Sequence, residues 1–213
     1  MTGHPISPRW RPREQILGGH FSPDSTRIIV TTRKSLQVWD AASGLPLSAP
    51  VKHRNEIRQV RFSPDSLLVI STSVDETARV LDAASGELAC PPLLHDFAAH
   101  SGSFTTKADT VLTRTANQVT RLWKLRSNAA QSRTLNHTGP VRCAEFSRDG
   151  QRVLTASVDG TARLWDAATG AHLKTFSHEG AVMDAAFSSD AGSWSRPVRT
   201  EPRASGMRCQ ANP

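Results

Sequence analysis

The stretch HTGPVRCAEFSRDGQRVLTASVDGTARLWDAATG, His137 to Gly170, decides the fold of this chain. Within it, VRCAEF, QRVLTAS and TARLW are short runs of strand-forming residues, and they are bounded by the turn sequences SRDG, VDG and DAATG. A fourth run of this kind, AHLKTF, follows the last turn. The pattern predicts four consecutive antiparallel strands joined by tight turns.

The rest of the chain consists of copies of this stretch. Phenylalanines equivalent to Phe146 recur with separations of 41, 42, 42 and 41 residues, at Phe21, Phe62, Phe104, Phe146 and Phe187. Histidines stand nine residues before four of them, at His53, His95, His137 and His178. A period of this length is typical of repeat folds in which each repeat forms one sheet. It predicts four complete sheets and the first strand of a fifth, Val182 to Phe187.

Several phrases of the repeat resemble the WD-repeat family of β-propellers: FSPD at 21–24 and 62–65, VWDAASG at 38–44 and SVDGTARLWDAATG at 157–170. The resemblance covers residues 16–190 and is similar to bacterial multi-repeat members, some of which follow serine/threonine kinase domains. It implies an all-β fold of about four four-stranded antiparallel blades plus one orphan strand, an incomplete propeller. It also implies a non-catalytic scaffold whose blade rims dock other proteins. No kinase motif occurs in the sequence.

The clean repeat contains residues that suggest two different kinds of site. The resemblance implies that His137, Ser157, Asp159 and Trp165 form a structural hydrogen-bonded tetrad, whereas histidine, serine and aspartate together also suggest a hydrolytic triad. The set recurs with the repeat period and includes a tryptophan N–H, which a triad does not need but a fully satisfied buried network does. We therefore interpret the set as structural.

The other repeats keep only part of the tetrad. The second has Leu81 in place of the tryptophan, the third has Asn117 in place of the aspartate, and the first keeps Thr32 and Trp39 alone. The members that the second and third repeats keep are His53, Ser73 and Asp75, and His95, Thr115 and Trp123.

Composition excludes several classes of protein. Nothing resembles a transmembrane run or a signal peptide, so we expect a cytoplasmic protein that does not contact membranes. Cys90, Cys143 and Cys209 are widely spaced and suit reduced structural thiols. No catalytic group, metal cluster or phosphate-binding loop stands out, so we expect neither an enzyme nor a cofactor or metal site.

The net charge of +7 lies mostly in the termini. Residues 1–15 carry +2 and residues 191–213 carry +3, so the 175 residues between them carry only +2. This distribution favours two solvated basic tails over a nucleic-acid-binding face.

The tail of residues 191–213 departs from the repeat. Read in a shifted frame, the codons for Gly192 to Arg208 are compatible with a further copy ending in a Trp-Asp pair, which favours a frameshift close to Asp190. The domain organisation that we expect is a basic tail at 1–15, a WD-repeat region at 16–190 and a non-repeat tail at 191–213. Repeats are expected near 16–52, 53–94, 95–136 and 137–177, with a partial repeat at 178–190.

Two hypotheses for function remain open. In the first, the chain is a protein-interaction scaffold with unknown partners, and its contacts lie on the loops after the histidines and on the short turns. The residues expected on this rim are Arg54, Glu76, Asp96, Thr138, Val158 and Glu179. In the second, the chain is a fragment of a disrupted longer WD-repeat gene, such as one for a kinase-associated regulatory propeller, without independent function. An open arc of blades would expose apolar faces, so we also expect self-association or a strained closure.

Overall fold

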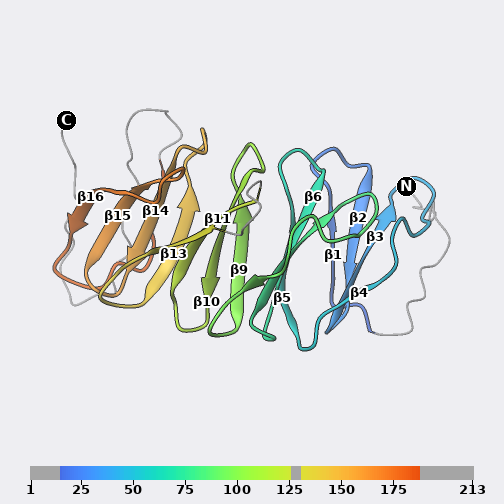
Figure 1. Cartoon of the computed structure of the whole chain (residues 1–213), viewed down its shortest axis with the longest axis horizontal. Coiled ribbons are helices and arrows are strands. Elements are labelled where there is room, and N and C mark those ends of the chain that lie inside the picture. The colour runs from blue at the N-terminus through green and yellow to red at the C-terminus, as the bar shows by residue number, and fades with distance from the viewer. Residues whose placement is uncertain (1–14, 126–130, 188–213) are drawn as a thin grey trace, which may run out of the picture. The chain divides into compact units, whose positions relative to one another are not determined.

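The computed structural model describes residues 15–125 and 131–187, and in these ranges the chain forms strands and no helix (Figure 1). The strands form four antiparallel sheets of four, each in sequential order. Sheet 1 contains β1 (Gly18–Phe21), β2 (Arg27–Thr31), β3 (Ser35–Asp40) and β4 (Val51–Lys52). Sheet 2 contains β5 (Ile57–Phe62), β6 (Leu68–Ser73), β7 (Thr77–Asp82) and β8 (Leu93–Leu94). Sheet 3 contains β9 (Ala99–Phe104), β10 (Thr110–Thr115), β11 (Thr120–Lys124) and β12 (Gln131–Leu135). Sheet 4 contains β13 (Val141–Phe146), β14 (Arg152–Ser157), β15 (Thr161–Asp166) and β16 (His172–Ser177).

Sheet 4 confirms the four strands predicted from the clean repeat. β14 lies in the middle, where Val153 pairs with both Phe146 of β13 and Trp165 of β15. Five of its six residues are buried, because its neighbours cover both edges and other residues cover both faces. β16 at the sheet edge is exposed at five of six positions. The all-β class and the four-stranded construction are therefore those expected from the sequence.

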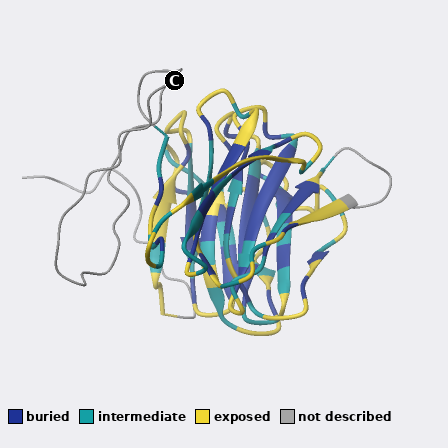
Figure 2. Ribbon diagram, turned by 90° about the vertical axis from the view of Figure 1, so that its left-hand side faces the viewer, coloured by how far each residue is buried: buried dark blue, intermediate teal, exposed yellow. Residues whose placement is uncertain are grey.

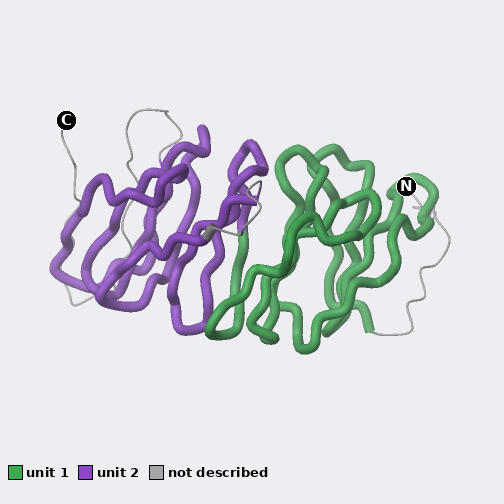
Figure 3. The backbone as a smooth tube through the Cα atoms, in the orientation of Figure 1, with its two compact units in different colours: residues 1–102 green, residues 103–213 purple. Residues whose placement is uncertain are grey.

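The chain divides into two compact units, residues 1–102 and 103–213 (Figure 3). Each unit has its own apolar core, and buried residues concentrate on the strands while the connecting turns are exposed (Figure 2). In the first unit, Ile29 and Val38 of sheet 1 pack in one cluster with Val69 and Leu81 of sheet 2. In the second unit, Leu112 and Leu122 of sheet 3 pack in one cluster with Trp165 of sheet 4. Face-to-face packing of successive sheets thus builds each core.

Turn residues with positive φ recur at equivalent positions. Gly44, Gly86 and Gly170 close the turn after the third strand with φ of 67°, 73° and 69°. Glycine carries no Cβ that would clash in this left-handed conformation. The turn before that strand has Gly160 at φ 81° in sheet 4 but Glu76 at φ 66° in sheet 2. The glycines of the DAATG-type turns therefore let the chain close these turns without a steric clash.

The predicted fifth-sheet strand at Val182 to Phe187 is wrong, because residues 183–187 have no strand conformation. This segment instead covers the face of sheet 4: Val182 and Ala185 are buried in one cluster with Leu154 and Leu164. The Phe187 N–H donates to Glu145 Oε1 at 2.7 Å. The strand is missing since the described chain offers no following strand with which it could pair.

The predicted basic tails lie outside the described residues, apart from Gln15 in the first. The frameshift interpretation of residues 191–213 also lies outside them and stays a prediction, which the nucleotide sequence across codon 190 would test.

Candidate functional site

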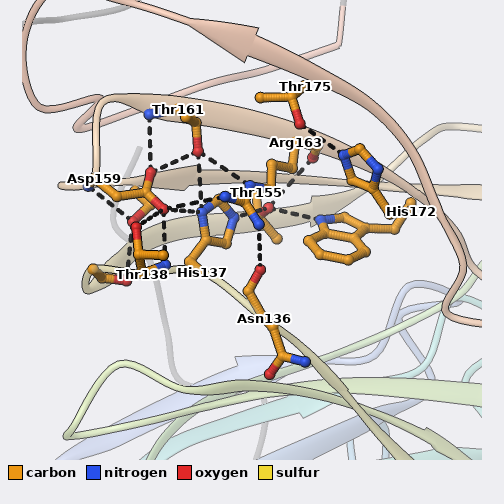
Figure 4. A network of polar contacts seen from close by, with 12 residues as sticks. Asn136, His137, Thr138, Thr155, Asp159, Thr161, Arg163, His172 and Thr175 are labelled. Atoms are coloured by element: carbon orange, nitrogen blue, oxygen red, sulfur yellow. Dashed lines mark hydrogen bonds and ion pairs between the residues drawn. The ribbon is translucent and has the colours of Figure 1, made fainter.

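The turn between β14 and β15 places Asp159 at the centre of a polar network (Figure 4). Its Oδ1 accepts hydrogen bonds from the N–H of Thr161 at 2.9 Å and from the hydroxyl of the same residue at 2.6 Å. Its Oδ2 accepts from the N–H of Thr138 at 3.0 Å and lies 3.0 Å from His137 Nδ1. One carboxylate thus ties the turn to the loop that precedes β13.

The network continues from the other ring nitrogen of His137. His137 Nε2 lies 2.7 Å from Thr155 Oγ1, and the Trp165 indole N–H donates to the same oxygen at 2.8 Å. The Asp159 carboxylate accepts only, so Nδ1 carries the proton and Nε2 accepts the Thr155 hydroxyl proton. In this arrangement each ring nitrogen and the hydroxyl of the four-residue network has a hydrogen-bond partner.

The structure brings together His137, Asp159 and Trp165 as predicted but replaces Ser157 by Thr155. The Ser157 hydroxyl instead holds the turn: it donates to the Gly139 carbonyl at 3.0 Å and accepts the Asp159 N–H at 3.1 Å. Residues two apart on a strand point to the same face, so both hydroxyls lie on the correct side of β14. Thr155 is the one next to the indole, because it lies two residues from Val153, the pairing partner of Trp165, whereas Ser157 lies four residues from it.

Sheet 2 carries a shortened copy of the same network. His53 Nδ1 lies 3.0 Å from Asp75 Oδ2, and His53 Nε2 lies 2.8 Å from Ser71 Oγ. Ser73 is again the turn residue, since its hydroxyl donates to the Asn55 carbonyl at 3.2 Å. Fully buried Leu81 occupies the tryptophan position, so apolar packing replaces the indole hydrogen bond.

Sheets 3 and 1 diverge further. Trp123 Nε1 donates to Thr113 Oγ1 at 2.7 Å, and Thr115 donates to Asn117 within its turn. His95 is buried. In sheet 1 the equivalent hydroxyl position is Val30. The sequence interpretation therefore missed three hydroxyl residues that lie nine positions after the repeat phenylalanines: Ser71, Thr113 and Thr155. Their recurrence with the repeat period is the sequence signal that could have identified them.

Burial and hydrogen bonding keep His137 neutral and Asp159 charged at neutral pH. Burial lowers the pKa of His137 below 6.5 and outweighs the neighbouring carboxylate. Burial would raise the pKa of Asp159, but hydrogen bonds from Thr161, His137 and the Thr138 N–H together hold it well below 3.8. In sheet 2 the same opposition of burial and hydrogen bonds lowers the pKa of Asp75 to about 2. At neutral pH each histidine is neutral and each aspartate is charged.

We expect the thermal unfolding midpoint to fall when the pH drops from about 7.5 to about 5. The pKa values of His53 and His137 are below 6.5 in the folded chain, so the unfolded chain binds more protons below that pH and stability decreases. Stability from the two aspartates is present above 3.8 and is lost in a second step as the pH falls further. Circular dichroism melts at stepped pH measure both windows.

The double variant His53→Gln/His137→Gln is the control for this pH dependence. It should start from a lower midpoint at neutral pH and show a flatter decline down to about pH 5. A wild-type midpoint that rises on acidification over the same range would contradict the assignment of neutral histidines.

Asp159, His137 and Thr155 are hydrogen-bonded in the sequence of a hydrolytic triad, but a substrate cannot reach them. The side chains of His137 and Asp159 are 1% and 5% exposed, and Thr155 is 0% exposed. The Thr155 oxygen is already shared with the Trp165 indole. No substrate atom can approach Thr155, so we interpret the network as structural. Its hydrogen bonds hold the loops in place. Among residues 15–125 and 131–187, no group of three or more histidine, cysteine or acidic side chains could hold a metal.

The six residues expected on the rim are all exposed: Arg54, Glu76, Asp96, Thr138, Val158 and Glu179. The Arg54 N–H donates to Asp75 Oδ2 at 2.9 Å, so the network fixes the backbone beneath these side chains. The sequence interpretation missed two neighbouring apolar residues, Leu94 and Phe97, which are 68% and 51% exposed. Exposed leucine and phenylalanine give no period of their own in the sequence, so only the structure reveals them.

Comparison with known families gives one match. The model of the WD domain, G-beta repeat, matches residues 46–82 and 130–166, which span the strands of sheets 2 and 4 that carry the histidine–aspartate networks, up to the end of β7 and β15. These two stretches are therefore WD repeats, and WD repeats are characteristic of protein-interaction scaffolds. No curated protein matches the chain. The described residues include no helix long and apolar enough to span a membrane.

Proposed function

We propose that this protein is a non-catalytic scaffold that binds other proteins through the loops above the histidine–aspartate networks. The observation that supports the proposal is that each network is inaccessible while the loops that it holds are exposed. The Asp75 and Asp159 side chains are 3% and 5% exposed, yet both accept hydrogen bonds from the backbone of the loop opposite. A binding surface benefits from such fixed loops, because little conformational freedom is lost on association.

In the first unit, hydrogen bonds connect four neighbouring loops into one rim. His53 N–H donates to the Lys34 carbonyl at 2.8 Å, and Ile57 N–H donates to the Arg33 carbonyl at 2.9 Å. Val74 N–H donates to the Glu56 carbonyl at 2.9 Å, and His95 N–H donates to the Glu76 carbonyl at 2.9 Å. Loops 33–34, 54–56, 74–76 and 95–97 are thereby linked, and we call them rim 1.

The side chains of rim 1 have the composition of an interaction surface. Arg54 and Phe97 are exposed, and the exposed Arg33 side chain forms an ion pair with Glu56. Arginine and aromatic residues dominate the energetics of many protein interfaces. We therefore infer that Arg54 and Phe97 carry most of the binding free energy of this rim.

The second unit has an equivalent rim of loops 138–140, 158–160 and 178–180. Val158 N–H donates to the Pro140 carbonyl at 2.9 Å, and His178 N–H donates to the Gly160 carbonyl at 2.8 Å. Its exposed side chains are smaller and less charged, with Thr138, Val158 and Glu179 in the predicted positions. Rim 1 is accordingly the better candidate for the principal contact.

We expect the double variant Arg54→Ala/Phe97→Ala to lose captured partners while keeping its fold. Proteins crosslinked to the tagged full chain in its native cells would be quantified by mass spectrometry, and those specific to the wild type should fall at least about tenfold, equivalent to about 1.4 kcal/mol. The matched control is Glu87→Ala/Lys107→Ala, which removes exposed side chains away from the rim loops. Equal capture by both variants would contradict the proposal.

A further inference from the structure

A groove of about 570 Å3 lies in the first unit between β1 and β5, and no residue of the rim 1 loops lines it. Both strands end the strand order of their sheets, so each has one edge unpaired among the residues that the structure describes. A volume of this size is in the range of sites that hold small ligands or short peptide segments.

The groove faces strand edges and not a sheet face. Every residue of β5, Ile57 to Phe62, lines it, as do Gly18, His20 and Phe21 of β1 and the preceding Leu17. Alternate residues of a strand point to opposite faces, so a lining that includes both sets must approach the strand from its edge. An exposed strand edge presents N–H and carbonyl groups that an extended peptide can pair with.

The side chains around the groove are apolar, basic or uncharged polar. Leu17 and Phe21 are 61% and 65% exposed, and Arg58 and Arg61 also line the groove, whereas no acidic residue does. Arg58 approaches Glu56 at 3.9 Å, but Arg61 has no ion-pair partner among the described residues. Such a lining complements a segment that alternates apolar and acidic side chains.

The charge of the chain itself argues against its own segments as the occupant. Residues 1–14 carry three arginines against one glutamate, and residues 188–213 carry four arginines against Asp190 and Glu201. A second copy carries a net charge of +7. Each of these would bring positive charge to a basic groove.

We propose that the groove between β1 and β5 binds an extended acidic segment of a partner protein by strand addition. Its backbone pairs with the β5 edge, its apolar side chains contact Leu17 and Phe21, and its carboxylates face Arg58 and Arg61. The Ile57 N–H already donates to the Arg33 carbonyl, so the other five of the six β5 residues remain for pairing. At about 3.3 Å per residue they accommodate a partner segment of about five residues. This site is independent of rim 1, so it extends the proposed scaffold function without resting on it.

Fluorescence anisotropy with the full chain tests the proposal. The probe is a labelled hexapeptide, Asp-Leu-Asp-Phe-Glu-Leu, and we expect saturable binding that is at least about tenfold tighter than binding of its twin Lys-Leu-Lys-Phe-Lys-Leu. Methylation of alternate backbone nitrogens should weaken the acidic probe by a similar factor, because it removes the donors that strand addition requires.

Two pairs of variants separate the groove from general surface charge. Arg61→Glu should weaken the acidic probe about tenfold, whereas Arg142→Glu makes the same charge change on β13 outside the groove and should have little effect. Phe21→Ala should weaken binding, and Leu173→Ala, which also removes a half-exposed apolar side chain, should not. The rim variant Arg54→Ala/Phe97→Ala should bind the probe normally.

Four results would overturn the proposal. The first is equal affinity for the acidic and basic probes, and the second is equal weakening by Arg61→Glu and Arg142→Glu. The third is displacement of the acidic probe by a synthetic peptide of residues 1–14, which would make the terminal segment the occupant. The fourth is tighter binding of a labelled single-stranded RNA hexamer than of the acidic probe, which would make the groove a nucleic-acid site.

Discussion

Asp159→Ala is expected to lower the free energy of unfolding by about 3 kcal/mol. The carboxylate accepts hydrogen bonds from the backbone or side chains of Thr138, Thr161 and His137. Alanine leaves His137 Nδ1 with only the Thr161 hydroxyl, 3.3 Å away, in a site where the histidine side chain is 1% exposed. A poorly paired buried donor costs more than a hydrogen bond contributes. Chemical denaturation followed by circular dichroism measures the change.

Asp149→Ala is the matched control for this prediction. Asp149 also lies in a turn of sheet 4 and accepts hydrogen bonds from the Ser147 hydroxyl and the Gln151 N–H, but it is exposed. Water can replace the lost acceptor there, so the destabilisation should be less than half as large. Equal losses for the two variants would mean that burial of the His137 network contributes nothing to stability.

Thr155→Val is expected to cost about 2 to 3 kcal/mol, although valine has nearly the shape of threonine. The substitution removes one oxygen that serves both the Trp165 indole N–H and His137 Nε2, and both atoms lie in a fully buried part of sheet 4. The β-branching stays the same and the hydroxyl is the group removed, so the measured loss of stability reports chiefly the polar network.

Ser157→Ala distinguishes the observed network from the one expected from the sequence. Ser157 donates only to the Gly139 carbonyl and accepts from the Asp159 N–H, so its loss should destabilise less than Thr155→Val does. The opposite order in denaturation experiments would restore Ser157 as the hydroxyl member of the tetrad.

The sequence predicts the strands well because turn residues and the repeat period mark every boundary. His137, Asp159 and Trp165 are also predictable, since each is a distinctive residue at a repeated position. The hydroxyl partner is not, because Thr155 and Ser157 are two residues apart on one strand and point to the same face. Only the position of the indole decides between them.

Two other features depend on contacts that a repeat pattern does not contain. Residues 182–187 copy the composition of a first strand, but a strand also needs a pairing neighbour, and the segment packs on sheet 4 through Val182 and Ala185 instead. The groove beside β5 arises because two strand edges in the first unit face the same space. Neither arrangement follows from local periodicity.

The networks in sheets 2 and 4 also bear on the order of folding. Each joins a histidine to an aspartate 22 residues later, so its closure requires only a short loop of chain. Short-range closures form quickly and with little entropic cost, and repeat arrays can nucleate within one repeat and extend to the next. The network of each of these repeats can therefore form as soon as that repeat has left the ribosome, before the following sheet has been synthesised.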